Sequence, residues 1–250
     1  YLLKYFEYFL IYFMVVNNLK NVKEAKIFIF FIFLTALLTC VYAWGQMPSG
    51  ERLSAPFEGK GGEPNTFAGY LLLIMAIILG LLLFAQTRRE KMLFLSFLAF
   101  IAVPFIMTLS RGGWLSFFPM FLAIIFFGKR YRFQLIMVLV IFAVIAPIAF
   151  PKKVYERVNE TFVPEKSVKV FNKEMYISES AAARFYSWNS AVERLRTQPL
   201  IGFGVPAGTV IDNQYSRVLS EVGFIGFGIF LWLISGIFKA ARYTYNNTKG

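Results

Sequence analysis

Long apolar runs recur along this 250-residue chain, and they constrain its fold more than any other feature. A helix needs about 20 mostly apolar residues to cross a bilayer. Hydrophobic residues make up 58% of the chain, more than in ordinary soluble domains. The seven runs near that length lie at 1–16, 27–44, 66–86, 91–109, 112–127, 133–150 and 216–238. The sequence therefore predicts an all-α fold, a polytopic membrane helix bundle.

Basic residues gather in the short segments between alternate runs, which indicates the direction of insertion. Twelve Lys and Arg residues there face only two acids, Glu24 and Glu90. Short cytoplasmic loops carry such an excess of positive charge, so these segments are expected in the cytoplasm. The basic positions are Lys20, Lys23, Lys26, Arg88, Arg89, Lys91, Lys129, Arg130, Arg132, Lys239, Arg242 and Lys249. The external side then receives the 45–65 loop, the Ser110–Gly113 turn and the 151–215 segment.

The 151–215 segment is too long for a simple connection, and we expect it to form a large external loop. Within it, 178–197 has apolar residues at three- to four-residue spacing, which predicts an amphipathic helix that ends before Pro199. Residues 1–250 are expected to form a single membrane domain. Because the first run carries Lys4 and Glu7 and starts without Met, we expect the chain to be a piece of a longer protein.

Several kinds of chemistry are excluded by composition. The chain has no His, one Cys and one Asp, so a His-based triad is impossible. A metal site needs several convergent ligands, and the chain has no Asp-x-Asp pair to supply them. Cys40 lies inside an apolar run, where a packing role is expected. The net charge of +12 does not indicate nucleic acid, because the basic residues flank apolar runs instead of forming a soluble basic face.

Polar and basic side chains meet on the external side by topology alone. The fork of an Arg side chain binds phosphate oxygens in bidentate fashion and stays charged when partly desolvated. Several arginines at one membrane face are therefore suited to a lipid-linked diphosphate. The candidates are Arg52 and Asn65 around the first external loop, Ser110 and Arg111 in the turn, Arg184 on the amphipathic helix, and Asp212, Asn213 and Tyr215 before the last run.

Each candidate also has a purely structural interpretation. Arg111 can cap a helical hairpin or extend its charge to lipid head groups. Arg52 can be an ordinary loop residue. Asp212 and Asn65 can each cap the helix that follows, by accepting from its first free N–H groups. These alternatives stay open at the level of sequence.

Other charged residues near the end of the external segment and the start of the last run are interpreted as structural. Arg217 and Glu221 are four residues apart on a helix, which favours an ion pair over a catalytic role. Arg194 and Arg196 are expected on a solvated helix face.

Short motifs follow one another in an order that points to a known family. They are Pro64-Asn65-Thr66-Phe67-Ala68, Leu109-Ser110-Arg111-Gly112-Gly113-Trp114, Pro199-Leu200-Ile201-Gly202-Phe203-Gly204, Asp212-Asn213-Gln214-Tyr215 and Glu221-Val222-Gly223. Over roughly residues 45–238, the chain resembles the O-antigen ligase and O-antigen polymerase superfamily of bacterial polysaccharide assembly. Members are longer, so the chain looks like the C-terminal portion.

The resemblance implies a glycosyltransferase of the bacterial cytoplasmic membrane that takes a glycan from an undecaprenyl diphosphate donor on the external face. It implies inversion at the anomeric carbon, no metal and no cofactor, with the bilayer and other polysaccharide assembly proteins as partners. Its essential arginines match Arg52, Arg111 and Arg184. Ligases have a histidine proposed as the base where this chain has Asp212, and polymerase-like members tolerate Asp there, which favours a polymerase.

The resulting hypothesis gives each candidate residue a role in catalysis or substrate binding. The three arginines hold the donor diphosphate, and Asp212 acts as general base or orienting group for the acceptor hydroxyl. Asn213 and Tyr215 contact sugar hydroxyls, with Asn65 and Ser110 as further substrate-binding residues. Two alternatives remain: a ligase that transfers finished glycan to lipid A core or protein, and a transporter or flippase for lipid-linked sugars, which predicts polar residues near mid-membrane and broken helices.

Overall fold

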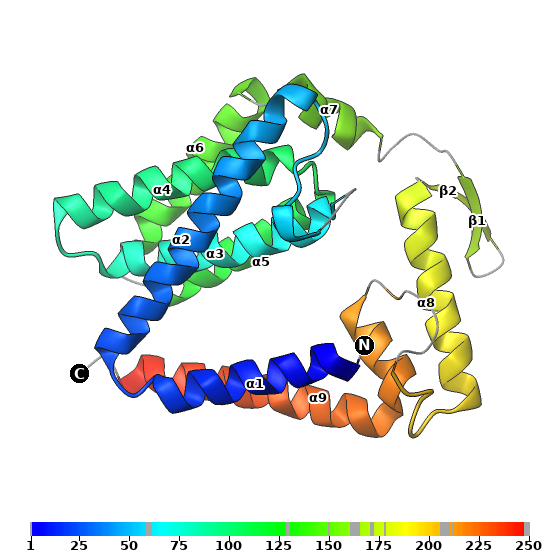
Figure 1. Ribbon diagram of the computed structural model, residues 1–250. Helices are drawn as coiled ribbons and strands as arrows, with labels where there is room; N and C mark the ends of the chain where they lie inside the picture. The colour runs from blue at the N-terminus through cyan, green and yellow to red at the C-terminus, as the bar shows by residue number, and fades with distance from the viewer. Residues whose placement is uncertain are drawn as a thin grey trace. The chain divides into compact units, whose positions relative to one another are not determined.

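The computed structural model contains two compact units, one formed by Met14–Asn159 and the other by Tyr1–Phe13 together with Glu160–Gly250 (Figure 1). Helix α1 (Leu2–Asn18) contributes to both units. The structure describes residues 2–58, 62–128, 131–149, 151–160, 166–170, 173–177, 179–205, 211 and 213–247.

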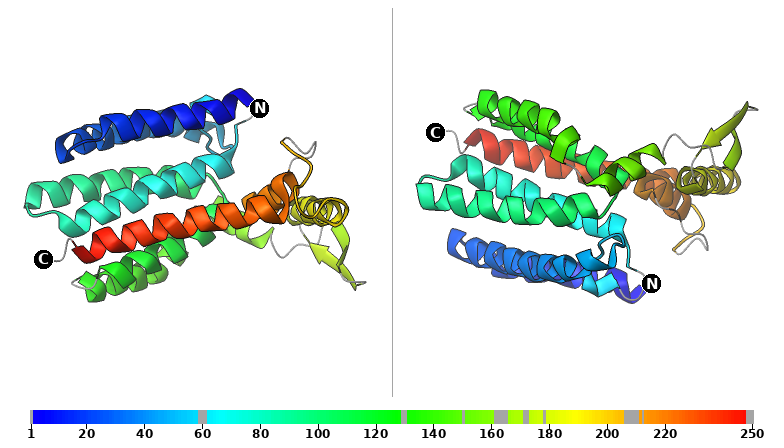
Figure 2. Two further views of the ribbon diagram at one scale, coloured as in Figure 1. Left: turned by 90° about the horizontal axis from the view of Figure 1, so that it is seen from below. Right: turned by 90° about the horizontal axis from the view of Figure 1, so that it is seen from above.

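The Met14–Asn159 unit is a helix bundle built around α3. Helix α3 packs against α2, α4 and α5, and α5 continues the bundle to α6. Both views of Figure 2 show α3 and α4 side by side. The elements are α2 (Val22–Gln46), η1 (Met47–Ser49), η2 (Pro56–Glu58), α3 (Pro64–Phe84), α4 (Arg88–Met107), α5 (Arg111–Phe127), α6 (Arg132–Ala149) and α7 (Lys152–Asn159).

Two of these helices begin at reciprocal caps. Asn21 Oδ1 accepts from Glu24 N at 2.9 Å, and Glu24 Oε2 accepts from Asn21 N at 3.2 Å, so α2 starts five residues before the apolar run at 27. Thr87 and Glu90 form the same capping box at the start of α4. Both caps lie in the basic segments that interrupt the apolar runs, so each of these helices starts a few residues before its apolar run.

The core of the bundle is formed mainly by one face of α3. Its fully or almost fully buried residues are Phe67, Ala68, Leu71, Ile74 and Ile78. Helix α2 meets this core through small side chains, because Ala36, Cys40 and Ala43 are each 0% exposed. Small residues allow helices in a membrane to approach closely. The predicted packing role of Cys40 is confirmed.

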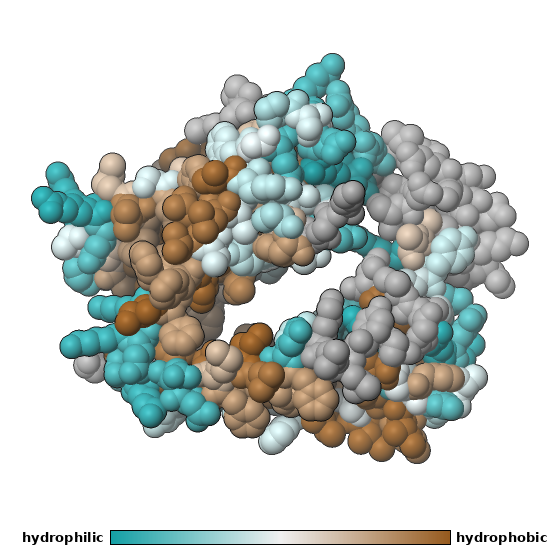
Figure 3. Space-filling model, in the orientation of Figure 1, coloured by the Kyte–Doolittle hydropathy of each residue, from teal (hydrophilic) through white to brown (hydrophobic). Residues whose placement is uncertain are grey.

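Apolar side chains also cover the outer surface of the helices. In the space-filling view they cover the middle of α2 (Figure 3). Phe30 and Phe31 are among the exposed apolar residues of this helix. Within the described residues, four helices are long and apolar enough to cross a membrane: Val22–Ser49, Pro64–Phe84, Arg88–Met107 and Gln214–Asn247. Arg111–Phe127 and Arg132–Ile141 are shorter apolar helices. The predicted class, a polytopic membrane helix bundle, is confirmed.

The second unit contains α8 (Glu179–Thr197), α9 (Gln214–Asn247) and a small hairpin. Helix α8 matches the predicted amphipathic helix and ends before Pro199, and it packs against α9. The hairpin pairs β1 (Lys166–Val170) with β2 (Lys173–Ile177) in antiparallel register. It was not predicted, because two five-residue strands rich in Lys carry little periodic signal.

Candidate functional site

Arg52 fastens the loop between η1 and η2 to the turn between α4 and α5. Its Nε donates to the carbonyl oxygen of Thr108 at 3.0 Å, and its Nη2 donates to the carbonyl oxygen of Leu109 at 3.4 Å. Beside these contacts, Leu53 N donates to the carbonyl oxygen of Met107 at 3.3 Å. Arg52 is therefore not a freely solvated loop side chain, because its guanidinium holds a turn far away in the sequence.

The turn that Arg52 holds has an unfavourable backbone conformation. Leu109 has a φ of 51°, in the left-handed region that a branched side chain rarely adopts. Thr108 is fully buried; its Oγ1 donates to the Phe105 carbonyl at 2.7 Å and accepts from Ser110 N at 3.3 Å. Such strain persists only where surrounding contacts impose it, and it is concentrated at functional sites.

Asn65 joins Arg52 to the start of α5. Its Oδ1 accepts from Arg52 Nη2 at 3.2 Å and from Ser110 Oγ at 2.9 Å. Ser110 is 2% exposed, and its Oγ also accepts from Gly113 N at 3.2 Å as the N-cap of α5. Asn65 does not cap α3, whose N-cap position is Glu63. Three predicted site residues thus share one hydrogen-bond network.

Arg111 is the first residue of α5 and stands beside this network. The first N–H groups of a helix and its dipole favour anions at that end. Gly113 lets α5 approach α3 closely, because a Cβ there would lie 2.8 Å from Ala68 Cβ. At Gly112 a Cβ would meet nothing within 4 Å. The start of α5 therefore combines a capped helix N-terminus with two predicted arginines, Arg52 and Arg111.

Sequence reasoning missed one basic residue of this cluster, Arg157 of α7. Its Nε donates at 3.4 Å to the carbonyl oxygen of Leu109, the same atom that Arg52 reaches. One turn earlier, Lys153 Nζ donates to the carbonyl oxygen of Gly50 at 2.6 Å. The one available signal was the four-residue spacing of Lys153 and Arg157, which places both on one helix face.

Asn213 and Tyr215 lie at the start of α9, in the other unit. Asn213 Oδ1 accepts from Tyr215 N at 2.9 Å and from Ser216 N at 3.4 Å, so Asn213 caps the helix. Tyr215 is 54% exposed, and its ring packs edge-on against Phe230 with a centroid distance of 5.9 Å. The cap lies one residue after Asp212, which is outside the described residues.

Helix α8 carries Arg184 on its surface. Arg184 is exposed one turn from Trp188, whose ring lies 5.5 Å from that of Phe185. Arg196 is exposed as predicted, but Arg194 is half-buried with its guanidinium carbon 5.7 Å from the centre of the Phe203 ring. Arg194 therefore binds an aromatic face and does not belong to a purely solvated surface.

Helix α9 is broken at Gly223, which has φ 62° and ψ −167°. Residues 199–204, which we name the strap, fill the break with backbone hydrogen bonds. They are Phe203 N to Ser220 O at 3.0 Å, Gly204 N to Glu221 O at 2.8 Å, Phe224 N to Pro199 O at 2.8 Å, and Ile225 N to Leu200 O at 3.3 Å. An unbroken helix would instead join Ser220 to Phe224 and Glu221 to Ile225. The strap thus replaces two helical hydrogen bonds with four.

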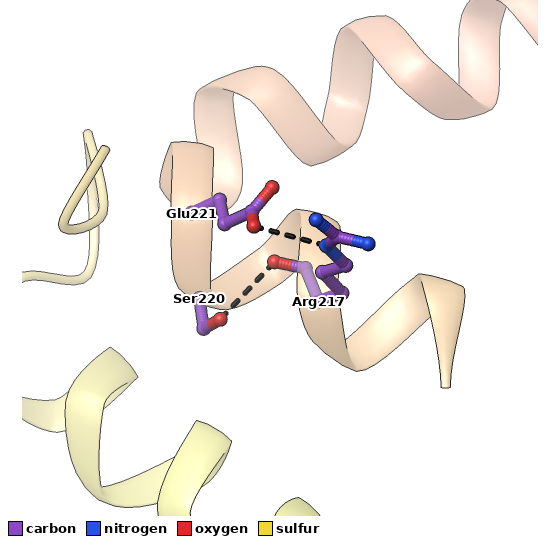
Figure 4. Close-up of polar contacts among 3 residues, drawn as sticks. All are labelled: Arg217, Ser220 and Glu221. Atoms are coloured by element: carbon purple, nitrogen blue, oxygen red, sulfur yellow. Dashed lines mark hydrogen bonds and ion pairs between the residues drawn. The ribbon is translucent and has the colours of Figure 1, made fainter. Parts of the chain in front are cut away.

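An ion pair between a half-exposed arginine and a buried glutamate lies immediately before the break. Arg217 Nε and Glu221 Oε1 are 3.0 Å apart, and Ser220 Oγ donates to the Arg217 carbonyl at 3.1 Å (Figure 4). The Glu221 side chain is 9% exposed and that of Arg217 is 36% exposed. The predicted structural ion pair is confirmed, and it lies on the helical turn that the strap contacts.

Removal of Arg217 is expected to destabilise the protein more than neutralisation of Glu221. Arg217→Ala takes the cationic partner from a buried carboxylate, whereas Glu221→Gln keeps the shape and removes the charge. We expect Arg217→Ala to lower the free energy of unfolding by about 2 kcal/mol, and Glu221→Gln to lower it by less than about 1 kcal/mol. Thermal unfolding of the purified protein in detergent measures both, and equal losses would contradict the expectation.

The structure brings the predicted site residues together in two groups. Arg52, Asn65, Ser110 and Arg111 belong to the Met14–Asn159 unit, while Arg184, Asn213 and Tyr215 belong to the other. Among the described residues, no three His, Cys, Asp or Glu side chains are grouped so as to hold a metal ion. The first group offers cations and N–H donors, which suits an anionic ligand.

Comparison with known protein families places this chain in one of them. A sequence profile described as O-antigen ligase matches residues 97–231, more than half of the 250-residue chain. The matched range includes the Ser110–Arg111 turn, α8, the strap and most of α9. No curated protein and no solved structure matches.

Proposed function

Because the chain belongs to the O-antigen ligase family, which consists of membrane enzymes acting on lipid-linked glycans, we propose that it is a polysaccharide polymerase. It transfers a glycan from an undecaprenyl diphosphate donor to the hydroxyl of an acceptor glycan. The reaction takes place at the external face of the bacterial cytoplasmic membrane, and it needs no metal.

The Arg52–Asn65–Ser110 network at the start of α5 carries this proposal. Arg52 is held by Thr108, Leu109 and Asn65, so its charge is fixed before any ligand arrives. Arg111 follows directly at the helix N-terminus. Fixed cations and N–H donors stabilise a charge that develops during reaction without having to reorganise. A departing lipid diphosphate develops such a charge, which supports its assignment to this site.

The transfer itself is an inverting displacement at the anomeric carbon. The acceptor hydroxyl oxygen forms a bond to that carbon as the bond to the diphosphate oxygen breaks, and the lipid diphosphate leaves with the electron pair. Asp212 accepts the hydroxyl proton as general base. Arg111 and Arg184 bind the diphosphate with Arg52. Asn213 and Tyr215 contact sugar hydroxyls. Asn65 holds Arg52 in place, and Ser110 holds Asn65.

The assignment of a polymerase over a ligase rests on Asp212. The ligases have a histidine at the matching place, and this chain has no histidine at all. The ligase alternative is supported by the description of the matching family. The length of the polymer and its attachment to lipid A core or protein in a deletion strain distinguish the two activities.

A transporter of lipid-linked sugars is favoured by one observation, the break in α9. Broken helices of transporters bind ions or substrate through unpaired backbone groups. In α9, the backbone groups of Ser220, Glu221, Phe224 and Ile225 are paired with the strap. The break therefore has a structural explanation, and the enzyme remains the better proposal.

Incubation of the full-length protein with a synthetic undecaprenyl diphosphate oligosaccharide tests the proposal directly. We expect longer glycans with inverted linkage and released lipid diphosphate, at the same rate with and without a chelator. Arg111→Ala and Arg184→Ala should each lower the rate about 100-fold, because each loses a charged contact to the leaving group. Arg196→Ala, on the same exposed helix as Arg184, is the control. Wild-type rates in both site variants would exclude the proposed site.

A further inference from the structure

We propose that Arg157 is a further substrate-binding residue, which α7 delivers to the Leu109 turn so that it binds the donor diphosphate together with Arg52 and Arg111. The ligand class rests on the function proposed above. The convergence of Arg52 and Arg157 on the turn that precedes Arg111 rests on the structure alone.

Helix α7 is built to lie against this part of the bundle. It spans Lys152–Asn159 and buries Val154, which is 4% exposed. Its basic residues are Lys152, Lys153 and Arg157. Lys152 points away, with a side chain 91% exposed and 3.9 Å from Glu156. Lys153 and Arg157 reach inward to backbone oxygens, so the two faces of α7 have different roles.

The inward contacts fasten α7 to the two segments that form the Arg52 site. Lys153 Nζ lies 2.6 Å from the carbonyl oxygen of Gly50, two residues before Arg52. Gly50 has a φ of 75°, and a Cβ at this residue would lie 2.8 Å from Lys153 Nζ. Arg157 Nε lies 3.4 Å from the carbonyl oxygen of Leu109, two residues before Arg111. Helix α7 is therefore attached to the two segments that carry Arg52 and Arg111.

The guanidinium groups of Arg52 and Arg157 share one hydrogen-bond acceptor, the carbonyl oxygen of Leu109. Arg52 Nη2 and Arg157 Nε both lie 3.4 Å from the same Leu109 oxygen. These contacts orient both guanidinium groups, each of which is a planar fork of N–H donors. Two guanidinium groups beside one oxygen place cationic N–H donors from two different segments next to each other. A diphosphate has oxygens on two phosphorus atoms and can be bound from several directions at once.

The structural alternative is that Arg157 only ties α7 to the bundle. The two roles predict different effects of a substitution. Loss of a purely structural contact lowers the unfolding temperature, whereas loss of a ligand contact weakens binding of the diphosphate. Arg157→Ala, Arg157→Lys and Lys152→Ala of the full-length protein separate them. Lys152 is the matched control, since it is a cation of the same helix that points away from the turn.

Two measurements are made on each variant: the half-saturating concentration of the lipid diphosphate donor in the transfer assay, and equilibrium binding of inorganic diphosphate. We expect Arg157→Ala to raise the half-saturating concentration and the Kd of inorganic diphosphate about tenfold, as for loss of one charge-assisted hydrogen bond. Arg157→Lys should recover part of the loss, and Lys152→Ala should match wild type. Thermal unfolding checks that each variant is folded.

The inference is overturned if Arg157→Ala lowers the unfolding temperature but leaves both binding constants unchanged, or if Lys152→Ala weakens binding as much as Arg157→Ala does. The binding assay also separates this inference from the proposed function. Binding of inorganic diphosphate that depends on Arg157, in a protein that transfers no glycan, would support the site and refute the enzyme. Glycan transfer that depends on Arg52 but not on Arg157 would support the proposed enzyme and refute the role of Arg157 in binding.

Discussion

Arg52→Ala is expected to abolish glycan transfer, with a loss of at least about 100-fold, and to lower the free energy of unfolding by about 2 kcal/mol. Both effects come from one side chain, because Arg52 holds the Thr108–Leu109 turn as well as Asn65. Without it the left-handed conformation of Leu109 loses the contacts that offset its strain. The transfer assay and thermal unfolding in detergent measure the two losses.

Two matched variants identify the cause. Arg52→Lys keeps the charge but cannot reach three acceptors with a planar fork, so we expect it to recover little activity. Arg89→Ala removes an exposed arginine at the start of α4 and should behave as wild type. An Arg52→Ala protein that keeps half or more of the wild-type rate would remove Arg52 from the site, whatever its effect on unfolding.

Gly223→Ala should cause the largest loss of stability among the glycine variants. Gly223 has φ 62° and ψ −167°, a conformation available almost only to Gly. A Cβ there would lie 2.4 Å from the carbonyl carbon and oxygen of Leu200 and 2.6 Å from Ile201 N. These are backbone atoms of the strap, which cannot move aside without loss of its hydrogen bonds. We expect a loss of about 4 kcal/mol or more in the free energy of unfolding.

Other glycines of the same unit separate steric clash from backbone strain. Gly204 has a φ of 77°, but a Cβ at this position would meet nothing within 4 Å, so Gly204→Ala should cost about 1 kcal/mol. Gly228 lies in helical α9 with open space around it, and Gly228→Ala should be neutral or slightly stabilising. Thermal unfolding in detergent compares the stability of the three variants Gly223→Ala, Gly204→Ala and Gly228→Ala. Equal losses at Gly223 and Gly204 would show that the strap does not pack against the break.

Much of the helical framework was predictable, because the signals for it are local. Apolar runs interrupted by basic residues place the helices, and capping residues such as Thr87 and Glu90 place their starts. The association of Asn65 and Ser110 with Arg52 was also predictable in outline, since topology alone placed all three on one side. Their hydrogen bonds were not, because they depend on the left-handed turn at Leu109.

Features that depend on pairing between distant segments were missed. The 216–238 run predicts one continuous helix, since nothing in its hydropathy marks Gly223 as a break. The break exists because the strap supplies partners for the backbone groups of Phe224 and Ile225. Arg157 was missed for a similar reason: its neighbours belong to a turn almost 50 residues earlier, at Leu109.

The strap has a consequence for how this chain is made. A helix that enters the hydrocarbon with unpaired backbone groups is strongly disfavoured. Because residues 199–204 precede α9, they leave the ribosome before Phe224 and Ile225 do. Their carbonyl oxygens are therefore already synthesised when the N–H groups of the break emerge. The order of segments along the chain allows α9 to be inserted already bent, with no later rearrangement inside the bilayer.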